Sequence, residues 1–247
     1  TGGSTMKTNR AETAWNDTWM GRVIVAILFI SVLVTPLWAQ DKKEVSVEDL
    51  AKKSQNPVDP MISIPLQNNI NFKYGPNNNT QNVLNIQPVI PFSLNKEWNL
   101  ITRTIAPVVN QPWPEQKFGL GDVNISFFLS PANPKKLAGG DFIWGAGPIL
   151  QFPTATGEYL GTGKWAAGPA AVGVYMKGPW VIGLLGNKLW SYAGETKRET
   201  VNQMLLQPFV NYNLPNGWFV VSSPILNAYW QAKKAGNVWL VPMGGGV

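Results

Sequence analysis

A strict alternation of apolar and polar residues, starting near Met61, is the feature that most constrains the fold. In "MISIPLQNNINFKY", residues 61–74, the even positions from Ile62 to Tyr74 are apolar except for Asn68, and the odd positions are mostly polar. Successive side chains of a β-strand point to opposite faces, so this period predicts a strand with one apolar face. Residues 82–94 and 121–130 alternate in the same way. We therefore expect an all-β chain.

The alternating segments have the lengths and connections of a membrane barrel. About ten of them lie near residues 61–74, 82–94, 97–109, 121–130, 141–153, 164–176, 179–193, 201–214, 217–230 and 237–247. A tilted strand crosses a bilayer with roughly 9 to 11 residues. Short turns near 95–96, 177–178 and 215–217 alternate with longer polar loops, and 131–140 is the long member of the short series. We predict an antiparallel transmembrane β-barrel of the outer-membrane type, inserted with the help of the barrel-assembly machinery.

The tryptophans fall into two groups along these segments. Trp98, Trp144, Trp180 and Trp218 follow connections at the short-turn end, and Trp165, Trp190, Trp230 and Trp239 lie near the long-loop end. Two aromatic girdles at the membrane interfaces would give this distribution. A soluble β-sandwich whose core is filled by tryptophan remains the alternative.

The two ends of the chain suggest a processed, exported protein. "MGRVIVAILFISVLVTPLWAQ" has a basic residue at Arg22, an apolar run and a small residue at Ala39, which is the layout of a secretory signal peptide. We expect residues 1–39 to be an upstream extension and signal peptide, with translation starting at Met6 or Met20. Residues 40–60 would form a periplasmic tail or plug, with a short helix capped by Ser46. Residues 61–247 would form the barrel; because "VPMGGGV" resembles mid-strand sequence, we expect truncation there and about twelve strands in the complete protein.

The composition excludes several kinds of chemistry. The chain has no cysteine and no histidine, which removes thiolate nucleophiles, disulfides and any Ser-His-Asp site. Only Asp122 among the carboxylates lies close to a strand interior, so no acid and base pair can be proposed. The net charge is +6, but basic and acidic residues are interspersed, which disfavours nucleic-acid binding. We expect no enzyme activity, no cofactor and no metal; an outer-membrane lipid enzyme is the weakest alternative.

A long repeat links two hairpin regions. "NVLNIQPVIPFSLNKEW", residues 82–98, aligns at an offset of 120 with residues 202–218, and Gln-Pro occupies the same phase in both copies. "WGAGP" at 144–148 is similarly echoed by "WAAGP" at 165–169. Proline removes a ladder donor, so we predict a β-bulge at Pro88 and another at Pro208.

The polar residues opposite the apolar face form the candidate site. They are Gln67, Asn69, Asn71, Lys73, Asn85, Gln87, Arg103, Asn124, Ser126, Gln203, Gln207 and Asn211. In a closed barrel these groups would line or fill the lumen. Two interpretations stay open: a polar network that bonds to itself and holds the barrel shape, or a passage for small polar or anionic solutes.

Several motifs together resemble one family. "QNVLNIQPVIPFSLNKEWNLITRTIAPV", "FGLGDVNISFFLSP", "WGAGPILQFPTAT", "LGTGKWAAGP" and "NQMLLQPFVNYNLPNGW" are similar to bacterial outer-membrane proteins labelled neuromedin U, related to the group named for the MetA pathway of phenol degradation. The resemblance covers about residues 50–247. It implies an outer-membrane barrel in contact with lipid that acts as a channel or transporter for small molecules, with hydrophobic or aromatic compounds among the candidates. A structural or surface-interaction barrel with a filled lumen is the alternative.

Overall fold

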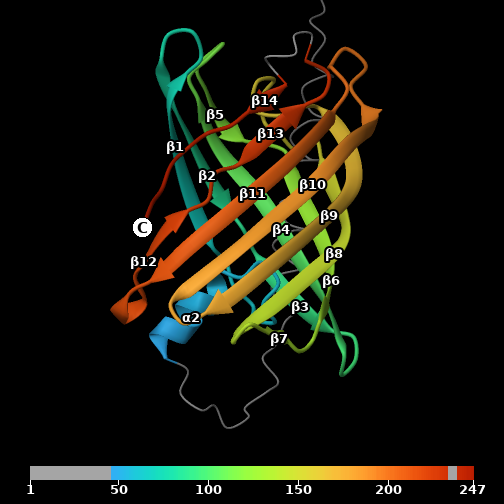
Figure 1. Ribbon diagram of the computed structural model, residues 1–247. Coiled ribbons are helices and arrows are strands. Elements are labelled where there is room, and N and C mark those ends of the chain that lie inside the picture. The colour runs from blue at the N-terminus through green and yellow to red at the C-terminus, as the bar shows by residue number, and fades with distance from the viewer. Residues whose placement is uncertain (1–45, 233–237) are drawn as a thin grey trace, which may run out of the picture. The chain divides into compact units, whose positions relative to one another are not determined.

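The computed structural model describes residues 46–232 and 238–247. In this part of the chain one antiparallel sheet curls into a half-barrel, accompanied by one short α-helix (Figure 1). The prediction of an all-β, antiparallel chain is therefore confirmed. The predicted signal peptide lies outside the described residues.

Each long strand of the sheet pairs with the long strands that precede and follow it along the chain. The order is β1-β2-β4-β6-β8-β9-β10-β11-β13-β14, and the short strands β3, β5, β7 and β12 pair with β4, β4, β8 and β11. The bounds of the main path are β1 Leu66–Tyr74, β2 Asn79–Ile86, β4 Trp98–Gln111, β6 Val123–Pro131, β8 Gly140–Phe152, β9 Lys164–Lys177, β10 Trp180–Gly194, β11 Asn202–Asn213, β13 Leu226–Tyr229 and β14 Trp239–Leu240. The short strands are β3 Val89–Ser93, β5 Lys117–Leu120, β7 Lys135–Leu137 and β12 Phe219–Ser222. No pairing joins β1 to β14 in the described ranges.

The helix α2, Val47–Ser54, precedes the sheet. The Ser46 side chain accepts a hydrogen bond from the Asp49 backbone N–H at 3.1 Å, as the predicted cap requires. Acidic residues occupy the first turn and Lys52 and Lys53 the last turn, which complements the helix dipole. A single 3-10 turn, η1 Pro215–Gly217, joins β11 to β12.

Within residues 46–232 and 238–247, no helix is both long and apolar enough to cross a membrane.

The convex outer face of the sheet is apolar and exposed. On β1, Leu66, Ile70 and Phe72 are 67%, 51% and 74% exposed, while the intervening Gln67 and Asn69 are half-buried on the concave inner face. Other exposed apolar side chains on the outer face include Ile90, Phe92, Phe118, Leu129, Trp144, Trp165, Ile182, Leu184, Val210 and Val220. The predicted alternation is thus present, and its apolar side is the outer one.

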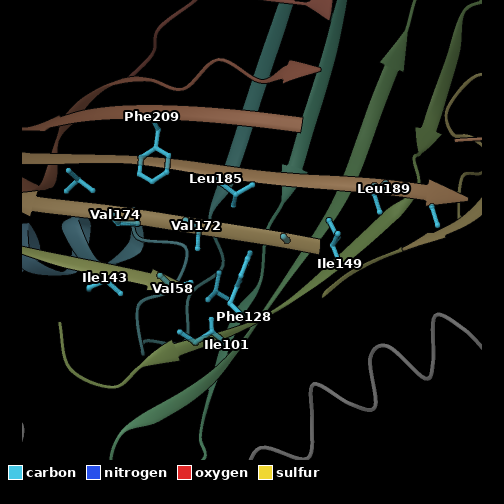
Figure 2. Packing of buried hydrophobic residues seen from close by; sticks show 14 of the residues in the cluster. Val58, Ile101, Phe128, Ile143, Ile149, Val172, Val174, Leu185, Leu189 and Phe209 are labelled. Carbon is cyan, nitrogen blue, oxygen red and sulfur yellow. The ribbon is translucent and has the colours of Figure 1, made fainter. Parts of the chain in front are cut away.

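The inner face is partly apolar, which corrects the expectation that the residues opposite the apolar face are polar. A buried apolar inner cluster covers the inner face of β8 to β11 and extends to β4 and β6; it comprises Val58, Val89, Ile101, Phe128, Ile143, Ile149, Ala166, Ala170, Val172, Val174, Val181, Leu185, Leu189, Val201 and Phe209 (Figure 2). Segments such as "AAVGVYM" and "WVIGLL" are apolar at both odd and even positions. These strands therefore carry apolar side chains on both faces, and those on the concave side belong to the buried cluster.

The repeat at offset 120 reappears as identical strand pairing. Asn85 pairs with Pro107, and their equivalents Leu205 and Asn227 also pair. The turns match too, since the Leu94 N–H donates to the Trp98 carbonyl and the Leu214 N–H to that of Trp218. The preceding strands follow the same rule: Leu66 pairs with Ile86, and Gly186 with Leu206. The repeat is therefore a three-strand unit, β1-β2/β3-β4 and β10-β11-β12/β13.

Pro88 and Pro208 both lie at ladder interruptions, but neither forms the predicted bulge. β2 ends at Ile86 and β3 resumes at Val89, and the pairing with β4 has the same register on both sides of the gap. The ladder between β11 and β10 is unbroken at Pro208. On the other side of β11, the partner strand is interrupted and consists of β12 and β13. No extra residue is inserted at either place. The missing proline N–H removes ladder bonds and leaves the register intact.

The second repeat places two Gly-Pro steps opposite each other. Pro148 of β8 pairs with Pro169 of β9 in an unbroken ladder, whereas the β6–β8 and β9–β10 ladders each lack rungs at these prolines. A Cβ added to Gly147 would lie 1.9 Å from the Phe127 carbonyl oxygen. A Cβ on Gly168 would lie 1.8 Å from the corresponding oxygen of Lys188. Glycine precedes each proline because the carbonyl that lost its N–H partner packs against the glycine α-carbon.

Aromatic contacts occur within each predicted tryptophan group. Trp98 and Trp144 meet edge to face, with ring centroids 6.0 Å apart. Trp230 and Trp239 do the same at 6.1 Å, and the Lys188 ammonium lies over the Trp230 ring at 4.8 Å. Each pair therefore joins members of a single group, in line with two separate aromatic bands.

Candidate functional site

A chain of hydrogen-bonded amides on the inner face ends on a buried arginine. The Arg103 Nη2 donates to Gln87 Oε1 at 2.5 Å, and Gln87 Nε2 donates to Gln67 Oε1 at 3.0 Å. Gln67 Nε2 in turn donates to Asn69 Oδ1 at 3.0 Å. These side chains come together because all four lie on the inner face: Gln67 and Asn69 on β1, Arg103 on β4, and Gln87 in the gap between β2 and β3. Four of the predicted site residues thus form one connected group, which we call the amide relay.

Arg103 carries its charge into the packed interior without a counter-charge. Arg103 is only 7% exposed. Along the described ranges, the ion pairs within 4.0 Å involve Lys117, Lys136 and Arg198, and none involves Arg103. Burying a charge away from an opposite charge costs several kcal/mol. A neutral amide can orient the guanidinium, but it cannot neutralise it.

Arg103 stands at the boundary between the amide relay and the apolar inner cluster. In the register across the sheet, Arg103 pairs with Val89 on one side and Ser126 on the other, and Ser126 pairs with Ile149. Ile101, two residues earlier on the same face, is fully buried against the strand that carries Phe128. Polar and apolar groups therefore meet at the guanidinium.

A second group of polar side chains lies toward the β1–β2 hairpin. Asn71 donates to Gln81, Gln81 donates to Gln111, and Gln111 Nε2 donates to the Tyr74 hydroxyl at 2.8 Å. Of these, only Asn71 was among the predicted site residues. The period-two rule assigned Tyr74 to the outer face, where its hydroxyl would find no such partner.

Lys73 is the predicted site residue that the structure places elsewhere. Its φ of 57° and a register shift between Asn71 and Tyr74 interrupt the alternation, so that Tyr74 takes the inward position. Lys73 itself is exposed. The two expected cations are therefore not neighbours on the inner face, and Arg103 stands without Lys73.

The remaining predicted residues are distributed over the inner face. Asn85, Ser126, Gln207 and Asn211 are buried, and Asn124 and Gln203 are half-buried. Gln207 Nε2 donates to the Ser223 hydroxyl at 2.8 Å. The buried Oδ1 atoms of Asn124 and Asn211 have no hydrogen-bond partner among the described residues. Such atoms are normally satisfied by water or a ligand.

The segment after α2 enters the concave side of the sheet. Asn56, Val58 and Asp59 are all buried, and Val58, at 1% exposure, is part of the apolar inner cluster. Figure 2 shows Val58 beside Phe128. We call residues 55–60 the inner segment; sequence alone left open whether this region is a tail or a plug.

Two polar contacts hold α2 at one end of the half-barrel. Gln55 Nε2 donates to Asn213 Oδ1 at 2.8 Å, and the Asn216 backbone N–H donates to Glu48 Oε1 at 2.9 Å. Figure 1 shows α2 at the lower end, near the turn between β11 and β12. The bonds from its own backbone and from Asn216 lower the pKa of Glu48. The helix thus anchors the inner segment.

Asp59 is a buried carboxyl group within the inner segment. Burial raises its pKa to about 6, and the nearby Lys53 charge offsets part of that rise. Desolvation disfavours the carboxylate form. The inner segment therefore carries a group that changes charge near neutral pH.

Asp122 organises the loop between β8 and β9. Its carboxylate accepts from the Thr162 backbone N–H at 2.6 Å, the Thr162 hydroxyl at 2.7 Å and the Ala155 N–H at 3.2 Å. All of these donors belong to the loop, so the one carboxylate near a strand interior is occupied by structural bonds.

No group of three or more acidic side chains within the described residues is arranged to hold a metal ion. Compared with known proteins, the chain matches no protein-family model, no curated protein and no solved structure.

Proposed function

We propose that this chain forms an outer-membrane β-barrel that lets small molecules cross the membrane. One observation carries the proposal: the outer face of the sheet presents exposed apolar side chains while the polar side chains are buried on the inner face. A water-soluble β-protein places these two classes of residue the other way round. In a bilayer the outer face would meet lipid, while the amide relay and the other buried polar side chains would lie inside.

The aromatic pairs agree with this placement. Trp98 contacts Trp144 and Trp230 contacts Trp239, and Lys188 lies over the rings of Trp190 and Trp230. Tryptophan and lysine prefer the interface between hydrocarbon and water, where the ring and the ammonium each find a suitable environment. We therefore propose membrane localisation and small-molecule passage together, which is also what the family resemblance implies.

A barrel with a filled lumen is the second candidate, and the inner segment favours it. Val58 and the apolar inner cluster occupy part of the concave side. A filled interior would make the protein a structural or surface-interaction element.

Planar-bilayer recording on the full chain separates the two candidates. We expect discrete conductance steps after insertion of the detergent-folded protein, and flux of a small solute from loaded vesicles. Absence of both conductance and flux would favour the filled barrel. A boiled, unfolded sample serves as the control for detergent leakage.

The membrane placement itself has a separate test. Tryptophan fluorescence should be quenched when the protein is reconstituted in vesicles containing brominated lipids, because the outer-face rings would touch the acyl chains. A chain that stays monomeric and folded in water without detergent, and escapes this quenching, would contradict the proposal.

A further inference from the structure

The internal repeat carries a neutral residue at the position equivalent to Arg103. At the offset of 120, Gln87 corresponds to Gln207 and Arg103 to Ser223. Both glutamines bond to their equivalent partner: Gln87 accepts from Arg103, and Gln207 donates to the Ser223 hydroxyl. The strands pair in the same register in both copies, although β12 ends at Ser222, one residue before the equivalent of Arg103. A hydroxyl group therefore serves as the partner of this glutamine in one copy, and the buried cation in the other copy needs another explanation.

We propose that Arg103 binds the carboxylate of a small amphiphilic anion inside the barrel. This inference rests on the proposed function, because it names the class of solute that the interior would accept. A buried ionisable residue in a membrane protein marks a solute or ion site by default. The missing counter-charge at Arg103 is then supplied by the solute.

The guanidinium geometry favours a carboxylate. Arginine presents five N–H groups in a planar fork that matches the two oxygens of a carboxylate. In the described ranges, one side-chain bond is formed, from Nη2 to Gln87. Gln67 holds Gln87 in turn. The amide relay thus fixes the orientation of the fork and leaves the other donors for a ligand.

The surroundings favour an anion with an apolar body. Val89 and Ile101, both fully or nearly fully buried, neighbour Arg103 on the inner face, and Ile149 follows one strand beyond Ser126. An inorganic anion would gain nothing from these groups. A carboxylate with a short hydrocarbon chain would place its charge on Arg103 and its chain beside these apolar side chains.

The first experiment needs no variant. The thermal unfolding temperature of the detergent-folded full chain is measured against increasing sodium hexanoate, with hexanamide and sodium acetate as matched controls. We expect hexanoate to raise the unfolding temperature in a saturable way, because it binds the folded state. Hexanamide lacks the charge and acetate lacks the chain, so each should need at least about tenfold higher concentration for the same shift. Equal shifts from hexanoate and hexanamide would overturn the proposal.

The second experiment uses the residue found in the other copy. Arg103→Ser places a hydroxyl beside Gln87, as Ser223 does beside Gln207. We expect the variant to fold and to lose the hexanoate effect. Lys73→Ser removes an exposed cation outside the site and should keep it. A hexanoate response retained in Arg103→Ser would refute the assignment.

Failure of this inference differs from failure of the proposed function. Conductance without a hexanoate response would leave the channel and refute the anion site. A charge-dependent hexanoate response without conductance would leave the anion site, now as a ligand site in a filled barrel. Both outcomes are read from the same purified sample.

Discussion

Replacing Val58 with alanine tests how the inner segment is held. Val58 is 1% exposed and packs in the apolar inner cluster. Losing two buried methyl groups removes about 1.6 kcal/mol of transfer free energy at roughly 0.8 kcal/mol each. The residual cavity adds to this loss, for a total of about 2 kcal/mol. We expect the population with the inner segment detached to rise about 30-fold, since 1.4 kcal/mol corresponds to a factor of ten.

Limited proteolysis measures that population. Trypsin can cut after Lys52 or Lys53 only when α2 has left its docked, helical state, and such cleavage follows the open population while reclosing is fast. Mass spectrometry of the fragments gives the cleavage rate. Val47→Ala is the matched control, because Val47 is 61% exposed on the same helix and should change the rate little. A Val58→Ala rate within about threefold of wild type, or equal to that of Val47→Ala, would show that burial of Val58 does not hold the segment.

Three further predictions concern other parts of the sheet and its connections. Gly147→Ala should prevent the heat-modifiable folded form on gel electrophoresis, because the added Cβ would lie 1.9 Å from a carbonyl oxygen, whereas Gly173→Ala, with contacts no closer than 3.5 Å, should fold; normal folding of Gly147→Ala would contradict the close packing. Because burial raises the pKa of Asp59 to about 6, docking of the inner segment should be strongest below pH 4 and weaken as the pH rises through 6. A spin label at Leu50→Cys should report this as increasing mobility, and Asp59→Asn should remove the pH dependence; an unchanged pH response in that variant would point to another group. Asp122→Asn should cost about 1 to 3 kcal/mol of local stability in the 154–163 loop, seen as faster hydrogen exchange there, and unchanged exchange would refute its organising role.

The strands could be predicted from the sequence because their physical cause is local. Alternation in residues 61–72 follows from the two faces of a strand, and it fixes which face of β1 is apolar. The tryptophan groups were likewise visible, and the contact between Trp98 and Trp144 joins two members of one group. These features depend on residue order alone.

The errors arose where a single backbone dihedral or a distant contact decides the outcome. At Lys73 a positive φ ends the alternation of inward and outward side chains, and the residue types at this position do not predict that conformation. The apolar inner face of β8 to β10 corresponds to strands that are apolar at both odd and even positions, a pattern that does not reveal which face is covered. Val58 lies in a polar, proline-containing stretch, and its burial depends on strands far along the chain. The hydrogen bond between Arg103 and Gln87 depends on the register of β4 as well as on its period, and the sequence alone gives only the period.

The facing Gly-Pro steps of β8 and β9 have a mechanical consequence. These two strands share an unbroken ladder with each other, but both lack rungs toward their outer neighbours at the level of Pro148 and Pro169. The β8–β9 hairpin is therefore a stiff unit with a weakened ladder on each side. When the sheet is strained or heated, deformation should concentrate in the β6–β8 and β9–β10 ladders, so the hairpin can tilt as one rigid body while the strand register on either side is preserved.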